Sequence, residues 1–150
     1  MAAELTALSE PLFDLLQKEK FVILNSIDAE SGSPTVNAIS WVYAVSPKKI
    51  RFAVDQRSRI VSNIKQSNQV ALTFFGSGTV NAIYGTAYVA TESLENVPFP
   101  LACLDIEINS IRDAMFYGAR ISVEPEYEKT YDKRAAEKLD GQVYSAMKNA

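Results

Sequence analysis

Histidine is absent from this sequence, which also contains only one cysteine and one tryptophan. Without histidine, the chain cannot form Ser-His-Asp or Cys-His catalytic arrangements. It also lacks the usual ligand sets for zinc and non-haem iron, so we expect no metal site. The cysteine, Cys103, cannot form an internal disulfide and lies in an apolar stretch, which indicates an inert core thiol in a reducing compartment. Any chemistry therefore depends on a cofactor or on carboxylate, lysine and tyrosine groups.

Long apolar runs and a strong net charge are missing too. No run approaches the roughly 20 apolar residues that span a bilayer. Residues 1–10 lack a basic region followed by an apolar one, so we expect no signal peptide. The net charge is −3 and the sequence pI is about 5.0, which argues against binding to nucleic acid or to an anionic membrane. Together these observations predict a soluble, cytoplasmic protein.

The 150 residues fit a single domain in which short β-rich segments dominate. Leucines at helical spacing predict a first helix within residues 5–16, capped by Thr6 or Ser9. Runs rich in β-branched and aromatic residues predict strands over residues 21–28, 35–45, 50–54, 69–75, 79–91, 101–111 and 115–123. A short helix follows Ser58, and a polar helical tail covers residues 130–148, which Asp140-Gly141 can interrupt. Six or seven strands within residues 20–123 predict a mainly β barrel or sandwich.

The first candidate site is Arg57-Ser58-Arg59, at the start of the short helix. Backbone N–H groups at a helix N-terminus are unpaired, and the helix dipole favours an anion there. Two guanidinium groups beside a capping hydroxyl add charge-assisted donors that suit a phosphate. The alternative is a solvent-exposed helix cap flanked by surface arginines, and the residue types alone leave both interpretations open.

Two further candidates carry apolar or aromatic side chains. Residues 38–41 and 53–54 lie on neighbouring predicted strands, where exposed backbone between small or apolar side chains suits a flat aromatic ligand. Trp41 belongs to the first of these segments, although packing in the core or at a dimer interface also explains a tryptophan there. Phe116 and Tyr117 precede a glycine, so they either cover a ring system or end a core strand.

The order of these elements resembles the pyridoxamine 5'-phosphate oxidase-like, FMN-binding split-barrel family. The resemblance covers about residues 8–123, and its most specific part is Ile50-Arg-Phe-Ala-Val-Asp-Gln-Arg-Ser-Arg-Ile60, followed by residues 62–72. It points to the small bacterial proteins described as pyridoxamine-phosphate-oxidase-related. The resemblance implies a six- to seven-stranded antiparallel split β-barrel with short flanking helices and a C-terminal helix. It also implies a homodimer with FMN bound at the subunit interface.

The resemblance also assigns roles to particular residues. Ser58 and Arg59 match residues that bind the FMN phosphate, whereas Ile60 and Ala38 stand where the family has a lysine and an arginine. Both differences weaken the phosphate site, and Arg57 can compensate. Contacts to the flavin ring fall on Ile39, Ser40, Trp41, Ala53 and Val54. The partner subunit contributes residues near Val80 and Asn81. Phe116 and Tyr117 match aromatic residues that lie over the flavin.

The implied activity is an FMN-dependent oxidoreductase of unknown substrate, in which the flavin transfers electrons or hydride. The true oxidase also holds pyridoxal phosphate with a C-terminal segment of arginine, histidine and tryptophan, and this chain has no histidine and no late tryptophan. We therefore expect a different activity. The alternatives are a flavin carrier or stress-linked sensor without turnover, a member that binds deazaflavin or no cofactor, and a barrel that serves dimerisation only. No general acid or base stands out, and Tyr43 and Tyr117 are the conceivable proton donors.

Overall fold

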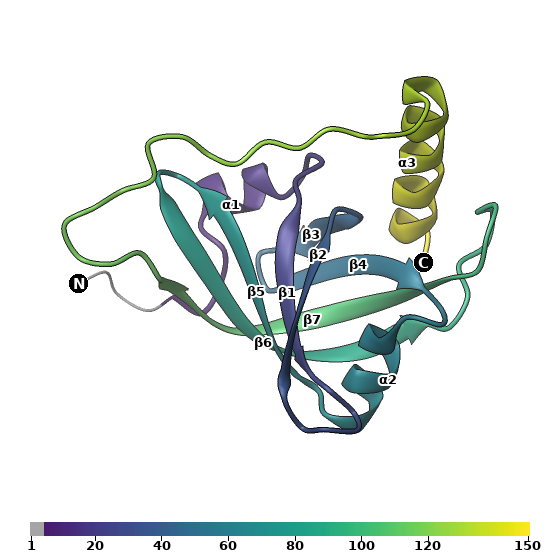
Figure 1. Ribbon diagram of the computed structural model, residues 1–150, viewed down its shortest axis with the longest axis horizontal. Coiled ribbons are helices and arrows are strands. Elements are labelled where there is room, and N and C mark those ends of the chain that lie inside the picture. Colours follow the sequence, from purple (N-terminus) through teal and green to yellow (C-terminus); the bar gives the residue numbers. More distant parts are fainter. Residues whose placement is uncertain (1–4) are drawn as a thin grey trace.

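The computed structural model describes residues 5–150, which form one seven-stranded antiparallel sheet and three helices (Figure 1). The elements in chain order are α1 (Glu10–Leu15), β1 (Val22–Ile27), β2 (Pro34–Ile39), β3 (Val42–Ser46), β4 (Lys49–Asp55), α2 (Arg59–Gln66), β5 (Gln69–Gly76), β6 (Thr79–Thr91), β7 (Leu101–Asp113) and α3 (Lys133–Lys148). The prediction of a mainly β fold is confirmed. Within the described residues, no helix is long and apolar enough to cross a membrane.

The sheet has the strand order β2-β1-β5-β6-β7-β4-β3, so β2 and β3 lie at its two edges. Only Ser40 and Trp41 separate these two strands in the chain. A connection this short spans at most about 11 Å, so the sheet has to curl until its edges approach each other. No ladder joins β2 to β3 in residues 5–150, and the barrel is therefore split along this line. The split barrel implied by the resemblance is confirmed.

The prediction of one strand over residues 35–45 is wrong, because the chain turns at Ser40 and Trp41. The carbonyl oxygen of Ser40 accepts from Val42 N at 3.0 Å, and that of Trp41 accepts from Ala53 N at 3.0 Å. As a result β2 pairs with β1, whereas β3 pairs with β4. The composition of the run cannot reveal this change of partner, since both halves are equally rich in β-forming residues.

Two further expectations are corrected. The first helix covers only Glu10–Leu15 and is capped by Ser9, since Leu5 instead exchanges backbone hydrogen bonds with Ile111. The strand expected over residues 115–123 does not form, because β7 ends at Asp113 and an exposed loop follows it. The apolar residues that suggested this strand do not reach the core.

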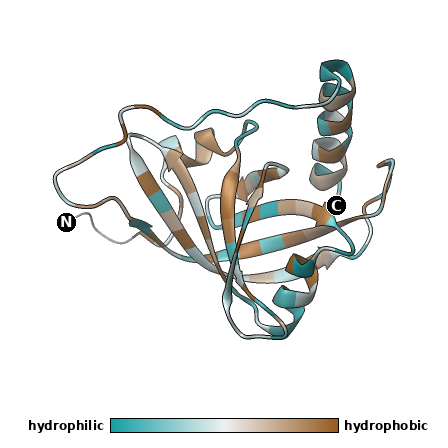
Figure 2. Ribbon diagram, viewed as in Figure 1, coloured by the Kyte–Doolittle hydropathy of each residue, from teal (hydrophilic) through white to brown (hydrophobic). Residues whose placement is uncertain are grey.

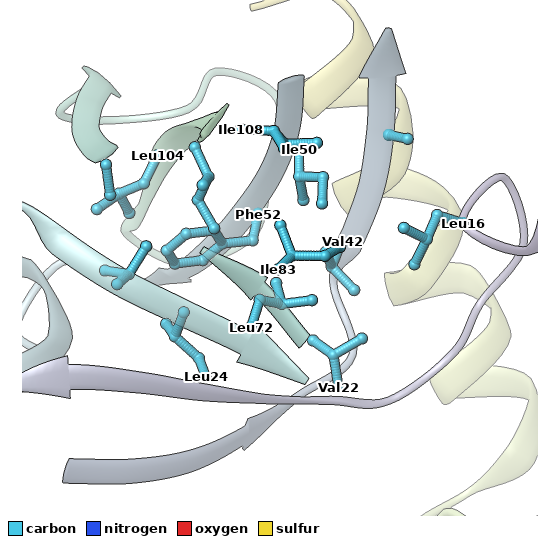
Figure 3. Close-up of a cluster of buried hydrophobic side chains, with 14 of the residues drawn as sticks. Leu16, Val22, Leu24, Val42, Ile50, Phe52, Leu72, Ile83, Leu104 and Ile108 are labelled. Atoms are coloured by element: carbon cyan, nitrogen blue, oxygen red, sulfur yellow. The ribbon is translucent and has the colours of Figure 1, made fainter. Parts of the chain in front are cut away.

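The interior of the barrel is apolar and receives side chains from six of the seven strands (Figure 3). In β5, buried residues alternate with partly exposed ones, as expected for a strand with one face in the core. Helices α1 and α2 lie at opposite ends of the barrel in the view of Figure 1, and they add Leu12 and Ile64 to the same cluster. Complete burial of such a side chain contributes about 1.5–3 kcal/mol, so this cluster is the main source of stability.

Helix α3 covers the outer face of β4, where a second apolar cluster forms (Figure 1). Figure 2 shows both polar and apolar positions on this helix. Its apolar side includes Val143 and Met147, which are fully buried. Asp132 caps the helix, with Oδ2 accepting from Ala135 N at 2.9 Å. The interruption considered at Asp140-Gly141 does not occur, because the buried residues beyond it keep the helix packed on the sheet.

A long segment connects β7 to α3 and passes over α1 in the view of Figure 1. Glu124 forms an ion pair with Lys20 at 2.9 Å. The ring of Tyr127 meets that of Phe21 edge to face, with centroids 5.4 Å apart. These contacts tie the segment to the residues that lead into β1, and they bring α3 to the side of the molecule where the barrel is split.

Candidate functional site

A surface cavity of about 330 Å³ lies at the split of the barrel, between the end of β2, the end of β4 and the start of α2. Ala38, Asp55 and Ile60 line part of it. The rest of its lining includes six residues for which the resemblance implies a cofactor contact: Ile39, Ser40, Trp41, Ala53, Val54 and Ser58. The curl of the sheet brings these separate segments together.

Strand β2 presents a free edge at this cavity. Among the described strands it pairs with β1 alone, so backbone N–H and C=O groups on its other edge have no strand partner. Ala38 is exposed, and Ile39 and Trp41 are partly buried. This surface can hydrogen-bond the heteroatoms of a flat ring while apolar side chains contact the ring itself.

The start of α2 forms the polar end of the cavity. Ser58 caps the helix as predicted, and its Oγ accepts from Ile60 N at 3.2 Å. Asn63 ties the helix to the neighbouring β1–β2 turn: its Oδ1 accepts from Ala29 N at 2.8 Å, and its Nδ2 donates to Ser26 Oγ at 3.2 Å. The positive end of the helix dipole is therefore held in a fixed position at the cavity.

Arg57 and Arg59 flank this helix start and pair with different carboxylates. Arg57 Nε lies 3.2 Å from Asp55 Oδ1, and its side chain is 86% exposed. Arg59 Nη2 lies 3.5 Å from Asp28 Oδ1 and 3.7 Å from Glu30 Oε2, and its side chain is 72% exposed. Hydrogen bonds from Arg57 hold the pKa of Asp55 below its usual range. Exposed pairs of this kind contribute little to stability because water and salt screen them, so both guanidinium groups can turn towards an anion at the helix start.

Five of the predicted site residues do not line the cavity of their own chain: Arg57 and Arg59, which flank the helix start beside it, and Asn81, Phe116 and Tyr117. Asn81 is buried in β6, where its Nδ2 donates to the carbonyl oxygens of Phe74 at 3.3 Å and Gly76 at 3.1 Å. Phe116 and Tyr117 lie in the loop after β7 and are 71% and 100% exposed. Their contact with a cofactor held by a partner subunit stays a prediction.

Two other groups considered for chemistry lie beneath α3 and do not line the cavity. Tyr43 is buried there, and burial raises the pKa of its hydroxyl. Cys103 belongs to the same cluster, and burial raises the pKa of its thiol to about 11. A thiol with this pKa stays neutral near pH 7, and its burial confirms the expectation that Cys103 is a core residue.

The contribution of α3 to the cavity wall was not predicted from the sequence. Trp41 Nε1 donates to Asp140 Oδ1 at 2.9 Å, and the Tyr144 hydroxyl donates to the carbonyl oxygen of Ser40 at 2.6 Å. The charged residues of the tail suggested a polar, solvent-facing helix. The signal for a packed helix was an apolar repeat at helical spacing, formed by Leu139, Val143, Ala146 and Met147.

A second cavity, of about 370 Å³, adjoins the first and shares residues 38–40 with it. Phe21, Tyr127 and Lys129 line its other side. Lys129 Nζ is held 2.7 Å from Glu19 Oε1, which fixes this basic group beside the two aromatic rings. The two cavities share lining residues at the end of β2, and we refer to them together as the groove.

The fold and this groove define a split-barrel protein with a candidate cofactor site at the split. Residues 8–103 match the family model described as pyridoxamine 5'-phosphate oxidase. This match covers more than half of the chain, which therefore belongs to the pyridoxamine 5'-phosphate oxidase family. The matched segment includes every residue that lines the first cavity, whereas α3 lies beyond it. Among curated proteins, none matches the chain significantly.

Several solved structures share the fold. A candidate pyridoxamine 5'-phosphate oxidase from Lactobacillus delbrueckii has a TM-score of 0.61 and 21% identity, covering 72% of this chain and 95% of the other. HupZ of Group A Streptococcus has a TM-score of 0.61 and 16% identity, with coverages of 75% and 98%. An F420 reductase has a TM-score of 0.59 and 15% identity, with coverages of 70% and 98%. At these identities the similarity shows the fold alone.

Proposed function

We propose that this chain binds FMN in the groove at the barrel split and catalyses a flavin-dependent oxidoreduction of a small molecule. The observation that carries this proposal is that residues 39–41, 53–54 and Ser58 converge on one cavity, in a chain that belongs to the pyridoxamine 5'-phosphate oxidase family. When bound, FMN supplies the electron or hydride transfer. The protein's own residues bind the cofactor, orient it and limit the access of water.

The residues present fit both the ring system and the phosphate of FMN. The free edge of β2 offers backbone groups to the ring heteroatoms, and Ile39 and Trp41 offer apolar contact. At the start of α2, the Ser58 hydroxyl, the helix N-terminus and the exposed side chains of Arg57 and Arg59 suit a phosphate. The adjoining cavity beside Tyr127 leaves space for a substrate next to the ring.

A homodimer in the cytoplasm belongs to the same proposal. The aromatic side chains of Tyr84, Phe116 and Tyr117 are 41%, 71% and 100% exposed in one chain. These exposed side chains are available for contact with a second copy, which is the partner that the family resemblance implies. Light scattering coupled to size-exclusion chromatography measures the mass directly, and a monomer with FMN bound would contradict this part of the proposal.

One observation favours a second candidate, in which the barrel binds deazaflavin or no cofactor. The two arginines at the start of α2 already have carboxylate partners in Asp28, Glu30 and Asp55. Ile60 and Ala38 add no cation at the two positions where the resemblance implies one. The local charge is therefore not strongly positive, and a phosphate has to displace these carboxylates in order to bind.

A comparison of FMN with riboflavin decides between these candidates, because riboflavin has the same ring and no phosphate. A hydrogen bond to a charged group contributes about 1.5–3 kcal/mol, so we expect FMN to bind roughly tenfold to over a hundredfold more tightly. Arg59→Ala should reduce this preference. Arg134→Ala, which removes an exposed arginine from the first turn of α3, is the matched control and should leave the preference unchanged.

Equal affinities for FMN and riboflavin would contradict the phosphate site, and the failure of both to bind would favour the second candidate. Turnover is tested separately, by following reduction of the bound flavin with NADH and NADPH and its reoxidation by added acceptors. Tight FMN binding with neither reaction would identify a flavin carrier or sensor instead of an oxidoreductase.

A further inference from the structure

Helix α3 contacts the wall of the first cavity at two points without lining the cavity itself. Asp140 Oδ1 accepts from Trp41 Nε1 at 2.9 Å, and the Tyr144 hydroxyl donates to the carbonyl oxygen of Ser40 at 2.6 Å. Asp140 and Tyr144 are four residues apart and therefore lie on the same face of the helix. Their partners are consecutive residues in the turn between β2 and β3, and both partners line the cavity.

The helix is held by contacts that do not involve the cavity. Val143 and Met147 are fully buried against the outer face of the sheet. Arg51 Nη1 donates to the carbonyl oxygen of Met147 at 3.0 Å and so binds the last turn of α3. Lys129 Nζ lies 3.1 Å from Asp140 Oδ2, the carboxylate oxygen that does not contact the indole. The Asp140 carboxylate is therefore fixed from two directions.

These contacts decide what the turn presents to a ligand. The indole N–H of Trp41 is used by Asp140, and the carbonyl oxygen of Ser40 is used by Tyr144. The wall therefore presents the ring of Trp41, which also packs against Phe99 with ring centroids 6.1 Å apart. If Asp140 were lost, the partly buried indole N–H would have no partner, and its need for one would favour other orientations of the ring.

We propose that Asp140 and Tyr144 are positioning residues, which hold Trp41 and Ser40 in the arrangement that accepts a flat flavin ring. This inference rests on the proposed function and deepens it. Helix α3 lies outside residues 8–103, the segment that matches the family model. The affinity for the cofactor then depends on an element that is not part of the shared family core.

The sole tryptophan makes this inference directly measurable, because fluorescence excited at wavelengths that tyrosine does not absorb reports Trp41 alone. The variants are Asp140→Ala, Asp140→Asn and Tyr144→Phe in the full chain. Glu137→Ala is the matched control, since it removes an exposed carboxylate from the same helix. Three properties are measured for each: acrylamide quenching of the fluorescence, the dissociation constant for FMN, and the circular dichroism spectrum that confirms folding.

We expect Asp140→Ala to increase acrylamide quenching and to weaken FMN binding about tenfold. The apparent affinity falls in proportion to the fraction of molecules in which Trp41 and Ser40 have the arrangement that accepts FMN. Tyr144→Phe should weaken binding to a smaller extent, since the hydroxyl acts on the backbone of Ser40 and not on the indole. Asp140→Asn keeps an oxygen that accepts from the indole and should restore both readouts towards wild-type values. Glu137→Ala should change neither.

Unchanged quenching in a folded Asp140→Ala variant would overturn the inference. So would increased quenching with wild-type FMN affinity, because the position of Trp41 would then not matter for binding. Equal losses for Asp140→Ala and Asp140→Asn would exclude the hydrogen bond as the cause. If the wild-type chain binds no FMN, the proposed function fails on its own, while the quenching data still show whether α3 holds Trp41 in place.

Discussion

The ion pair between Arg51 and Asp105 is the contact whose loss we expect to cost most. Arg51 Nε lies 2.7 Å from Asp105 Oδ1, and Nη2 lies 3.0 Å from Oδ2, so the pair is bidentate. The side chains are only 13% and 3% exposed, respectively. Arg51→Met keeps much of the apolar stem but leaves the buried carboxylate without its main partner. It also removes the hydrogen bond from Nη1 to the last turn of α3.

Removal of one partner from a buried pair costs about 3–5 kcal/mol of unfolding free energy. We expect about 3 kcal/mol, the lower end of that range, because two other groups lie near the Asp105 carboxylate. Lys49 Nζ is 3.9 Å from Oδ2, and the Tyr88 hydroxyl is 3.5 Å from the same oxygen. For a chain of this length, that loss lowers the melting temperature by about 6–12 °C.

Urea denaturation gives the free energy of unfolding of wild type, Arg51→Met, Asp105→Leu and the double variant. These four values complete a double-mutant cycle for the ion pair. The double variant removes both charges together, so we expect its stability to lie within about 1 kcal/mol of wild type. A loss below about 1 kcal/mol for Arg51→Met would show that the buried carboxylate finds adequate partners without the arginine. Additive losses in the double variant would refute the coupling between the two groups.

Four more predictions concern other parts of the chain. A Cβ added at Gly85 would lie 2.5 Å from the backbone oxygen of Glu107, so Gly85→Ala should cost about 1–3 kcal/mol. Gly141→Ala, where nothing lies within 4 Å, should stabilise α3 by about 0.5–1 kcal/mol in the same denaturation assay. Cys103 is buried with a thiol pKa of about 11, so a thiol reagent should label it only after unfolding; rapid labelling of the native protein would contradict its burial. Burial raises the pKa of Tyr144 to about 12 from an ordinary value of 10.0. The unfolded chain therefore loses this proton first, and stability should fall between those pH values. Tyr144→Phe should flatten that part of a plot of melting temperature against pH, and an unchanged plot would contradict the shift.

Most elements could be predicted because their signals are local. The strand over residues 79–91 depends on a run rich in β-branched and aromatic residues. The helix after Ser58 depends on one capping hydroxyl at its start, and the nearby sequence contains both signals. The single strand expected over residues 35–45 fails because its turn is set by hydrogen bonds to distant elements. Trp41 O accepts from Ala53 N, and Ser40 O accepts from the Tyr144 hydroxyl.

The candidate site could likewise be predicted from the sequence only in part. The resemblance identified Ser58 and the strand ends because these positions keep the order and spacing of the family. It did not reveal that Arg59 pairs with Asp28 and Glu30, since these carboxylates lie in a turn about thirty residues earlier in the chain. Charge balance at a binding site depends on such pairs, and their distances are decided only when the sheet has folded.

The sequence by itself determined the mainly β class, the helix start at Ser58 and the core position of Cys103, because periodicity, capping and composition act over a few residues. The lack of histidine limited the chemistry in the same direct way. Only the tertiary structure decided that β2 and β3 become opposite edges of one sheet and that α3 fastens the turn between them. Both outcomes require contacts between residues far apart in the chain. The pairings of β1 with β5 and of β4 with β7 join residues about fifty positions apart, and Trp41 and Asp140 are 99 positions apart. Their formation depends on the closure of the whole fold.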